Sequence, residues 1–309
     1  VSVIALIEEL LALSGGLPID CEFAITGEKD LQTLWLLQVR PLIMAHVPES
    51  PESQISRLEL VKNKVARGFE RHPFLMGSRT VYGVMPDWNP AEIIGIRPRP
   101  LALTLYQELV TDSIWAYQRN NYGYRNLRSF PLMATFCGIP YIDVRVSFNS
   151  FIPASLDDGI ATRLVDYYVY KLLAQPKLHD KVEFEIVWSC YTPDLAHRLA
   201  VLDEAGFSKC ERNEISMSLL KLTNSILHPK KGLWMQDSKK LHQLRKRHEI
   251  LMSSKLTDVD KIYWLIEDVK RYGTLPFAGL ARAGFVAVQI LKSLVEIDIF
   301  DESDYENFL

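Results

Sequence analysis

Two segments near the start of the chain carry side chains that suit a metal ion and a phosphate group. Residues 20–25 and 34–41 each alternate between apolar and polar side chains, which predicts two β-strands joined by a polar turn. If the strands pair symmetrically about this turn, Glu22 faces Gln38, and Arg40 lies on the same surface. Carboxylate and amide oxygens are hard ligands for magnesium, and a guanidinium can grip two phosphate oxygens at once. The hairpin therefore predicts a site for a metal-bound phosphate.

A plainer interpretation of the same hairpin remains open, in which its polar face is only solvated. Asp20 would then face Arg40 across the strands, and an exposed pair of this kind contributes little to stability. On either interpretation, uninterrupted alternation places Trp35, Leu37 and Val39 on the opposite, apolar face.

The hairpin resembles the end of the nucleotide-binding domain of phosphoenolpyruvate synthases, and the similar residues are Gly16–Phe23 and Leu37–Pro41. In that family, whose relatives include pyruvate phosphate dikinase and rifampin phosphotransferase, the segment closes an ATP-grasp domain. The resemblance implies ATP and Mg2+ as cofactors. It also implies that Glu22 is a metal ligand, that Gln38 contacts the metal or a phosphate, and that Arg40 contacts a phosphate.

The resemblance further implies that the chain is an internal fragment of a longer protein. One predicted helix, residues 1–13, precedes the hairpin, and the family's Gly-rich phosphate loop and upstream basic residues do not appear. The family's phosphorylated histidine lies in a motif containing Thr-Gly-Gly, and none of the seven histidines here has such a neighbourhood. The expected partners therefore include the upstream part of the ATP-grasp domain and a downstream histidine domain of the same protein. The fragment by itself holds no catalytic residue and is expected to be inactive.

Composition and charge are those of an ordinary globular protein. The 309 residues, 48% of them apolar, can form one large or two smaller cores, and no apolar run is expected to cross a bilayer. A net charge of -3 gives no general attraction to nucleic acid or an anionic membrane, and the basic helix Lys239–His248 is expected to be a solvated face. The four cysteines are widely spaced in apolar contexts, which indicates buried free thiols in a reducing compartment. We therefore expect a soluble, cytoplasmic protein that binds neither nucleic acid nor membranes.

The pattern along the chain predicts an α+β fold that is mainly helical. The C-terminal hairpin of an ATP-grasp domain, within residues 1–45, is followed by residues 46–309, a mainly helical acceptor-binding or linker domain with a small antiparallel sheet. The proline-containing segment His46–Ser56 is the predicted linker. Residues 73–100 are too rich in glycine and proline to form one regular element.

Strict alternation predicts two strands in the second domain, Tyr141–Phe148 and Val182–Trp188. If these strands pair, Glu183 and Glu185 lie across from Arg145. Helical spacing and cap residues predict helices at Gln54–Arg71, Leu101–Asn121, Ser155–Gln175, Thr192–Gly206, Glu211–Leu227, Asp237–Ser253, Thr257–Gly273, Leu275–Val295 and Asp301–Leu309. Alanine and glycine in the helix that starts at Leu275, Gly284 among them, indicate close packing against a neighbouring helix.

Arginine, asparagine and aromatic residues are concentrated in the loops and helix ends of residues 87–125. Arginine binds carboxylates or phosphates bidentately, and a Trp or Tyr ring can stack on a flat substrate, so the cluster suits a pocket for an anionic or aromatic acceptor. In the alternative, these arginines staple a loop-rich domain together by pairing with the acidic residues Asp87, Glu92, Asp112 and Asp143.

Part of this cluster also resembles the family. Trp88–Glu92, followed by the pair Pro100-Leu101, is similar to the segment that opens the acceptor-binding domain of rifampin phosphotransferase-like members. Gly138–Asp143 is similar to a Gly-x-x-Tyr-x-Asn strand of those proteins, with Asp143 in the place of Asn. The resemblance does not identify the acceptor. The possible acceptor-binding residues are Trp88, Asn89, Arg97, Arg99, Arg125, Tyr141, Asp143 and Arg145.

The residues and the resemblance together lead to two hypotheses. In the first, the whole protein is an ATP-dependent phosphotransferase, a kinase of the phosphoenolpyruvate synthase type. Mg-ATP would give a phosphoryl group to a carrier histidine absent here, which would pass it to an unidentified small-molecule acceptor. In the second, the region from about His46 onward is a non-catalytic binding or interaction module attached to a degenerate ATP-grasp domain.

Overall fold

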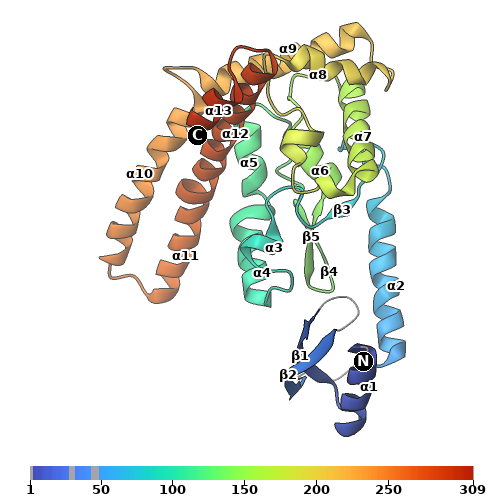
Figure 1. Cartoon of the computed structure of the whole chain (residues 1–309). Helices are drawn as coiled ribbons and strands as arrows, with labels where there is room; N and C mark the ends of the chain where they lie inside the picture. The colour runs from blue at the N-terminus through green and yellow to red at the C-terminus, as the bar shows by residue number, and fades with distance from the viewer. Residues whose placement is uncertain (1–2, 28–31, 43–48, 309) are drawn as a thin grey trace. The chain divides into compact units, whose positions relative to one another are not determined.

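The structure, a computed structural model, describes residues 3–27, 32–42 and 49–308. It is 60% helical, and the described residues form two small antiparallel sheets (Figure 1). The predicted α+β, mainly helical class is confirmed.

The chain forms two compact units, Val1–Leu58 and Glu59–Leu309. The domain boundary predicted between residues 45 and 46 falls in segment 43–48, which lies outside the described residues. The boundary between the units lies within helix α2, Pro51–Gly68, and each unit carries one of the two candidate sites.

The first unit is a helix followed by a β-hairpin. Helix α1, Val3–Leu13, is built mainly from good helix formers, and a turn that contains Gly15 and Gly16 follows it. Gly16 has a φ of 82°, and its amide donates to the Leu11 carbonyl at 2.8 Å, so that a carbonyl at the helix end is satisfied. The hairpin is made of β1, Ile19–Thr26, and β2, Thr33–Pro41.

Strand β2 contains one extra residue relative to β1. Glu22 pairs with Gln38, whereas Phe23 pairs with Leu36, so Leu37 is left over as a β-bulge. A single extra residue reverses the alternation of side chains along the strand. The residues on the turn side of the bulge therefore face the opposite way from the direction predicted by uninterrupted alternation.

Trp35 consequently lies on the polar face of the hairpin. It pairs with Ala24, two residues from Glu22 along β1, and its indole Nε1 donates to the Thr26 hydroxyl at 2.8 Å. The prediction that Trp35 belongs to the apolar face was wrong, because nothing in the alternation of the sequence marks the bulge.

Helix α2, Pro51–Gly68, begins inside the predicted linker. Pro51 occupies the first turn, where its missing N–H loses no intrahelical hydrogen bond, and the Ser50 hydroxyl accepts from the Ser53 amide at 3.3 Å. The linker predicted at His46–Ser56 is therefore wrong from Pro51 onward, because this proline starts a helix.

The second unit contains a three-stranded sheet with the order β3-β5-β4 (Figure 1). Its strands are β3, Tyr82–Gly83, β4, Met133–Phe136, and β5, Ile139–Asp143. Cys137 and Gly138 join β4 to β5 with positive φ at both positions, 52° and 79°. Positive φ at both central residues is typical of the two-residue turns that match the twist of a β-hairpin.

The strand predicted at Tyr141–Phe148 is wrong beyond Asp143. The chain turns there into helix α6, Val144–Asn149, and the Asp143 carboxylate caps this helix by accepting from the Val146 amide at 3.1 Å. All six residues of α6 are buried. A helix buried on every side shows no 3.6-residue stripe, so its sequence does not distinguish it from a strand.

The second predicted strand, Val182–Trp188, is also wrong. Val182–Ile186 forms a π-helical turn, η3, and Val187 follows in extended conformation. Glu183 and Glu185 therefore do not lie across a sheet from Arg145. Over so few residues, alternation of apolar and polar side chains is typical both of a half-buried strand and of a turn whose first and last residues are buried.

Several helices of the second unit begin at caps that are visible in the sequence. Asp157, rather than the predicted Ser155, caps α7, and Thr257 caps α11. Ser208 opens α9 with a full capping box. The remaining helices are α3 Pro90–Ile93, α4 Pro100–Tyr106, η1 Gln107–Thr111, α5 Ile114–Asn121, α7 Asp158–Ala174, η2 Pro176–Leu178, α8 Leu195–Arg198, η4 Leu199–Asp203, α9 Lys209–Leu227, α10 Leu233–Met252, α11 Asp258–Asp268, η5 Val269–Thr274, α12 Leu275–Glu296 and α13 Glu302–Phe308.

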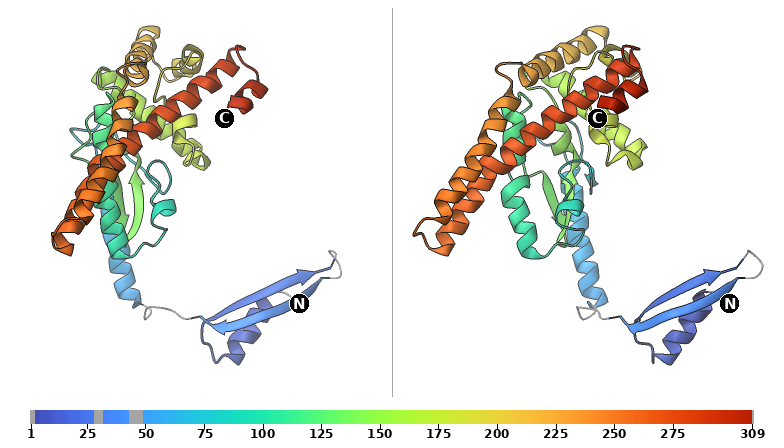
Figure 2. Two further views of the ribbon diagram at one scale, coloured as in Figure 1. Left: turned by 90° about the vertical axis from the view of Figure 1, so that its left-hand side faces the viewer. Right: turned by 60° about the vertical axis from the view of Figure 1, so that its left-hand side comes forward.

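Several predicted helices have other limits in the structure, and the helix predicted at Leu101–Asn121 is divided into α4, the π-helical η1 and α5. The helix predicted at Thr192–Gly206 is divided into α8 and the 3-10 helix η4. Gly273 does not end a helix, because the chain continues from α11 through the π-helical η5 into α12. Figure 2 shows α11 and α12 as one long rod with α10 beside it, in keeping with the contacts of α10 with both.

This rod, Asp258–Glu296, is long and apolar enough by length and composition to cross a membrane. The expectation that the chain contains no such run is therefore corrected. A third of its most apolar window is buried against the protein, and α12 packs on α5, α9 and α10. A core helix of a soluble protein passes the same test, so this single stretch is weak support for a membrane protein.

Three apolar clusters hold the second unit together. The largest gathers α6, α7 and η3 around the fully buried Phe148 and Tyr168. A second joins α5 to the sheet through Trp115 and Ile142, and a third joins α12 to α9 through Val286. These clusters fix α5, η3 and α12, the elements that surround the second candidate site.

The cysteines are free, as predicted, but they are not all buried. Cys190 is buried, Cys21 is partly exposed, and Cys137 and Cys210 are exposed. Burial raises the pKa of the Cys190 thiol to about 12.

Candidate functional site

The polar face of the hairpin brings together the residues that the sequence placed there. Glu22 lies opposite Gln38 and Asp20 lies opposite Arg40, so the predicted register is confirmed at these positions. Arg40 Nε donates to Asp20 Oδ2 at 2.8 Å, and Arg40 Nη2 lies 3.9 Å from Glu22 Oε1. The hydrogen bond to Asp20 and the charge of Asp20 raise the pKa of the Arg40 guanidinium. Glu22, Gln38 and Arg40 are all exposed.

This face alone does not supply the full ligand set that the predicted magnesium site requires. Within the described residues, no group of three or more His, Cys, Asp or Glu side chains comes together to hold a metal. A magnesium ion bound here would take oxygen atoms from Glu22 and Gln38, with water and phosphate oxygens completing its octahedron. Arg40 would reach a phosphate by exchanging its bond to Asp20 for one to the phosphate.

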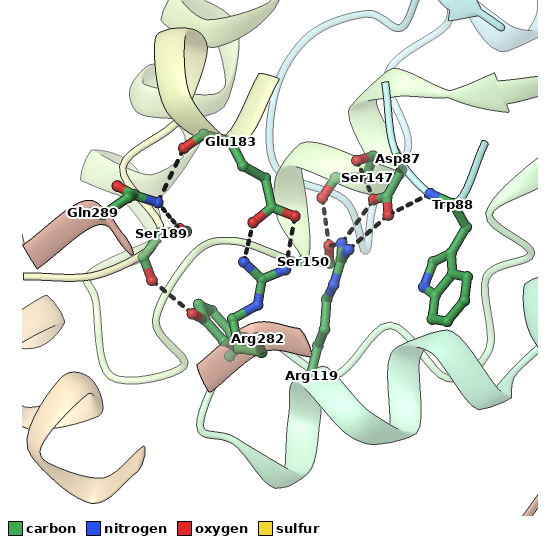
Figure 3. Close-up of polar contacts among 10 residues, drawn as sticks. Asp87, Trp88, Arg119, Ser147, Ser150, Glu183, Ser189, Arg282 and Gln289 are labelled. Carbon is green, nitrogen blue, oxygen red and sulfur yellow. Dashed lines mark hydrogen bonds and ion pairs between the residues drawn. The ribbon is translucent and has the colours of Figure 1, made fainter. Parts of the chain in front are cut away.

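A second candidate site lies in the second unit, where α5, η3, α12 and the loop before α3 surround a cavity of about 570 Å³. We call it the aromatic cavity, because its lining includes Trp88, Phe184, Phe277 and Phe285. Two buried ion pairs, drawn in Figure 3, also line it.

The first ion pair joins Asp87 to Arg119. Arg119 donates to both carboxylate oxygens of Asp87, at 2.8 and 2.7 Å. The Ser147 hydroxyl and the Trp88 amide donate to the same carboxylate at 2.6 and 2.9 Å (Figure 3). Burial alone would raise the pKa of Asp87, but the charge of Arg119 and these hydrogen bonds hold that pKa below its usual value.

The second ion pair joins Glu183, from η3, to Arg282, from the middle of α12. Arg282 Nη2 donates to Glu183 Oε1 at 2.9 Å, and Nη1 donates to Oε2. Burial would lower the pKa of Arg282, but the neighbouring Glu183 carboxylate raises it above its usual value. Gln289 Nε2 ties α12 to η3 a second time by donating to the Glu183 carbonyl at 3.2 Å and to the Ser189 hydroxyl at 3.3 Å (Figure 3).

The two ion pairs share one aromatic ring. The guanidinium carbon of Arg119 lies 4.3 Å from the centroid of the fully buried Phe151 ring, and that of Arg282 lies 5.0 Å from it. Cation-π attraction therefore adds to both pairs. The result is a rigid wall of charged groups that are already neutralised by one another.

Two of the aromatic side chains that line the cavity are more exposed than its two ion pairs. Phe277 lies 6.1 Å from Trp88 between ring centroids, and Phe285 lies 5.5 Å from Phe184. Phe277 is 58% exposed and Phe285 37%. Exposed rings that flank a concave surface are typical of a ligand-binding groove.

Two of the possible acceptor-binding residues, Trp88 and Asn89, line the aromatic cavity. Asn89 Oδ1 caps α3, accepting from the Ala91 amide at 3.0 Å. Arg97 and Arg99 are exposed and do not line the cavity. The structure thus brings together only part of the set that the sequence suggested.

The other residues of that set also lie outside the cavity lining, and three of them have structural contacts. Arg125 donates to the Leu156 carbonyl at 2.8 Å and pairs with Asp158 at 2.7 Å. Arg145 is buried and donates to two carbonyls at the end of α2. Asp143 accepts from the Thr80 hydroxyl at 2.6 Å. Tyr141 lies half-buried on β5.

The alternative, in which arginines stabilise the domain by pairing with acidic residues, is thus confirmed for only one of the four acids it names. Asp87 pairs with Arg119, whereas Glu92, Asp112 and Asp143 form no ion pair with arginine in the described part of the chain. Arg125 and Arg145 stabilise loops through other partners.

Sequence reasoning missed the contribution of α12. Arg282 interrupts an otherwise apolar helical stripe, and a charge at such a position needs a partner inside the protein. That signal was available, although it does not name the partner. Phe277 lies five residues before Arg282 and Phe285 lies three residues after it, and spacing alone does not distinguish these rings from core residues.

Comparison of the chain with protein-family models, with curated proteins and with solved structures finds no match.

Proposed function

We propose that the chain is part of an ATP-dependent phosphotransferase of the phosphoenolpyruvate synthase type, in which the first unit contacts Mg-ATP and the second unit binds the acceptor. The observation that carries the proposal is the register of the hairpin, which sets Glu22 opposite Gln38 and puts Arg40 on the same exposed face. The resemblance to this family implies that these three residues serve Mg-ATP together. A cytoplasmic location, where ATP is abundant, is part of the proposal.

In this proposal the hairpin acts by positioning and by neutralising charge, because phosphoryl transfer needs little covalent help from a protein. Bound magnesium would supply the positive charge that the phosphates require. Glu22 and Gln38 would hold the metal through oxygen atoms, and Arg40 would hold a phosphate. A histidine on another domain of the full-length protein would carry the phosphoryl group to the acceptor.

The apolar face of the hairpin supports a larger nucleotide-binding domain. Phe23, Ile25 and Leu36 are 40%, 50% and 42% exposed, and no residue of α1 is buried. A two-stranded hairpin is marginally stable by itself, and so much exposed apolar surface needs a partner. Further strands of an ATP-grasp domain would supply that cover.

Radiolabelled ATP tests the proposal in the full-length protein. A phosphoryl group retained on a histidine, and passed on when the right acceptor is added, is the expected result. ATP that is bound without any label reaching a histidine would contradict it.

A second function, a non-catalytic binding module, is favoured by one observation. The aromatic cavity and both of its ion pairs are formed entirely by residues of the unit Glu59–Leu309. Ligand binding by the cavity together with an absence of phosphoryl transfer would favour this function over the first.

A further inference from the structure

The charges around the aromatic cavity are unequal. Its lining contains two arginines, Arg119 and Arg282, and four carboxylates. Each arginine is held in bidentate fashion by a carboxylate through its two terminal nitrogens, which neutralises its charge. The other two carboxylates, Glu92 and Asp180, are exposed at the cavity surface and form no ion pair within the described residues. Two negative charges are therefore left over.

The aromatic rings point to the same kind of ligand. Trp88, Phe184, Phe277 and Phe285 line the same space as that surplus of negative charge. Lys292 already lies 5.1 Å from the Phe184 ring centroid, and Arg282 lies 5.9 Å from that of Phe285. Trp88 and Phe277, in contrast, have no cation over their rings within the described residues. A ring face attracts a cation, and aromatic walls beside carboxylates are the usual means of recognising organic ammonium groups. A phosphate or carboxylate would instead meet repulsion from Glu92 and Asp180.

Two buried polar atoms of lining residues lack a partner in the described part of the chain, Gln118 Nε2 and Arg282 Nε. Gln118, from α5, is 3% exposed, and its Nε2 donates to no protein group in the described part of the chain. Buried donors are nearly always satisfied, so this amide is available to a ligand that brings an acceptor oxygen. The donor and the surplus carboxylates are independent observations in one cavity.

We propose that the aromatic cavity binds an organic cation with a flat apolar body, whose ammonium group is held near Glu92 and Asp180 and whose oxygen accepts from Gln118. This ligand class differs from the anionic acceptor that the arginines of the sequence suggest. Only the further step, that such a cation is the phosphoryl acceptor, rests on the proposed function. The binding itself requires no ATP.

Isothermal titration of the chain with three small probes of similar size tests the proposal. The probes are benzyltrimethylammonium, neutral benzyl alcohol and anionic benzenesulfonate. The cation is expected to bind on the order of tenfold more tightly than the sulfonate at low salt, with a preference that falls as salt is added. Equal affinities, tighter binding of the sulfonate, or no binding of the cation would overturn the proposal.

Variants at exposed lining residues locate the binding. Glu92→Gln removes one charge and is expected to weaken benzyltrimethylammonium severalfold while leaving benzyl alcohol unchanged, whereas Glu59→Gln, on α2, should change neither. Phe277→Leu keeps an apolar side chain but removes the ring, so it should also weaken the cation, with Phe308→Leu as its control. Cation affinity unaffected by both cavity variants would overturn the assignment.

The two proposals fail separately. Cation binding without phosphoryl transfer in the full-length protein would contradict only the proposed function. Phosphoryl transfer together with a preference for benzenesulfonate in the cavity would contradict only the inference about the ligand.

Discussion

Arg282, in the middle of the apolar helix α12, holds both carboxylate oxygens of Glu183, which lies 99 residues earlier in the chain. Only a few per cent of the Arg282 side chain is exposed, and its guanidinium also lies against the Phe151 ring. One ion pair therefore fixes α12 to η3 and forms a wall of the aromatic cavity.

Arg282→Met keeps an unbranched stem and removes the charge of the guanidinium group. The variant is expected to lose about 3 kcal/mol of unfolding free energy, because Glu183 would remain largely buried without its partner. Urea unfolding measures this loss. Arg271→Met breaks an exposed pair with Glu267 and serves as the control, with an expected loss below about 1 kcal/mol. Equal losses of unfolding free energy in the two variants would show that the buried ion pair stabilises the protein no more than the exposed one.

The Asp87–Arg119 pair should give stability a characteristic dependence on pH. The folded pKa of Asp87 lies below its unfolded value, so its contribution is complete above about pH 4 and is lost as the pH falls through the folded pKa. Asp87→Asn is expected to cost about 3 kcal/mol at pH 7. The difference from the wild type should shrink in urea unfolding below about pH 4. A difference that stays constant down to pH 3 or grows would contradict this account.

The hairpin register was predictable because alternation and a central polar turn leave few ways to pair the strands. Leu37 was not recognisable as a bulge, since the extra residue is itself apolar and fits the pattern of its neighbours. Trp35 was assigned to the wrong face for that reason alone.

Of the residues that line the aromatic cavity, the sequence predicted only those that lie together on one loop. Trp88 and Asn89 belong to that loop, whereas Glu183 and Arg282 meet through the packing of η3 on α12. Pairing over that separation is decided by the tertiary fold, and the alternation of the sequence predicts strands at both α6 and η3. Local patterns identify neither element, because full burial of α6 removes the contrast between its faces, and η3 is too short for alternation to distinguish a strand from a turn.

Two glycines of α12 should respond oppositely to alanine. A Cβ on Gly279 would lie 1.9 Å from Asp237 Oδ2, which accepts a 2.7 Å hydrogen bond from the Tyr122 hydroxyl. Gly279→Ala is therefore expected to destabilise the protein by about 2 kcal/mol. Gly284 meets nothing within 4 Å, so Gly284→Ala should be neutral or stabilise by up to about 1 kcal/mol through helix propensity. Thermal unfolding of both variants decides the matter, and the opposite order would contradict the close contact at Gly279.

Thiol labelling should separate the cysteines. Iodoacetamide at pH 8 is expected to modify the exposed Cys137 and Cys210 in the native protein, and to modify Cys190 only after unfolding. Burial and a pKa raised to about 12 keep the Cys190 thiol protonated. Peptide mass spectrometry before and after urea measures the extent at each site. Rapid native labelling of Cys190 would show that its cluster opens readily.

The central claim is that the polar face of the hairpin serves Mg-ATP, and magnesium-dependent ATP turnover by the full-length protein tests it most directly. Gln38→Ala and Arg40→Ala are each expected to lower turnover about a hundredfold, because each removes an oxygen or a charge that would contact the metal or the phosphates. Arg57→Ala, an exposed arginine outside the hairpin, should leave turnover unchanged. Turnover close to the wild-type rate in both hairpin variants would contradict the claim.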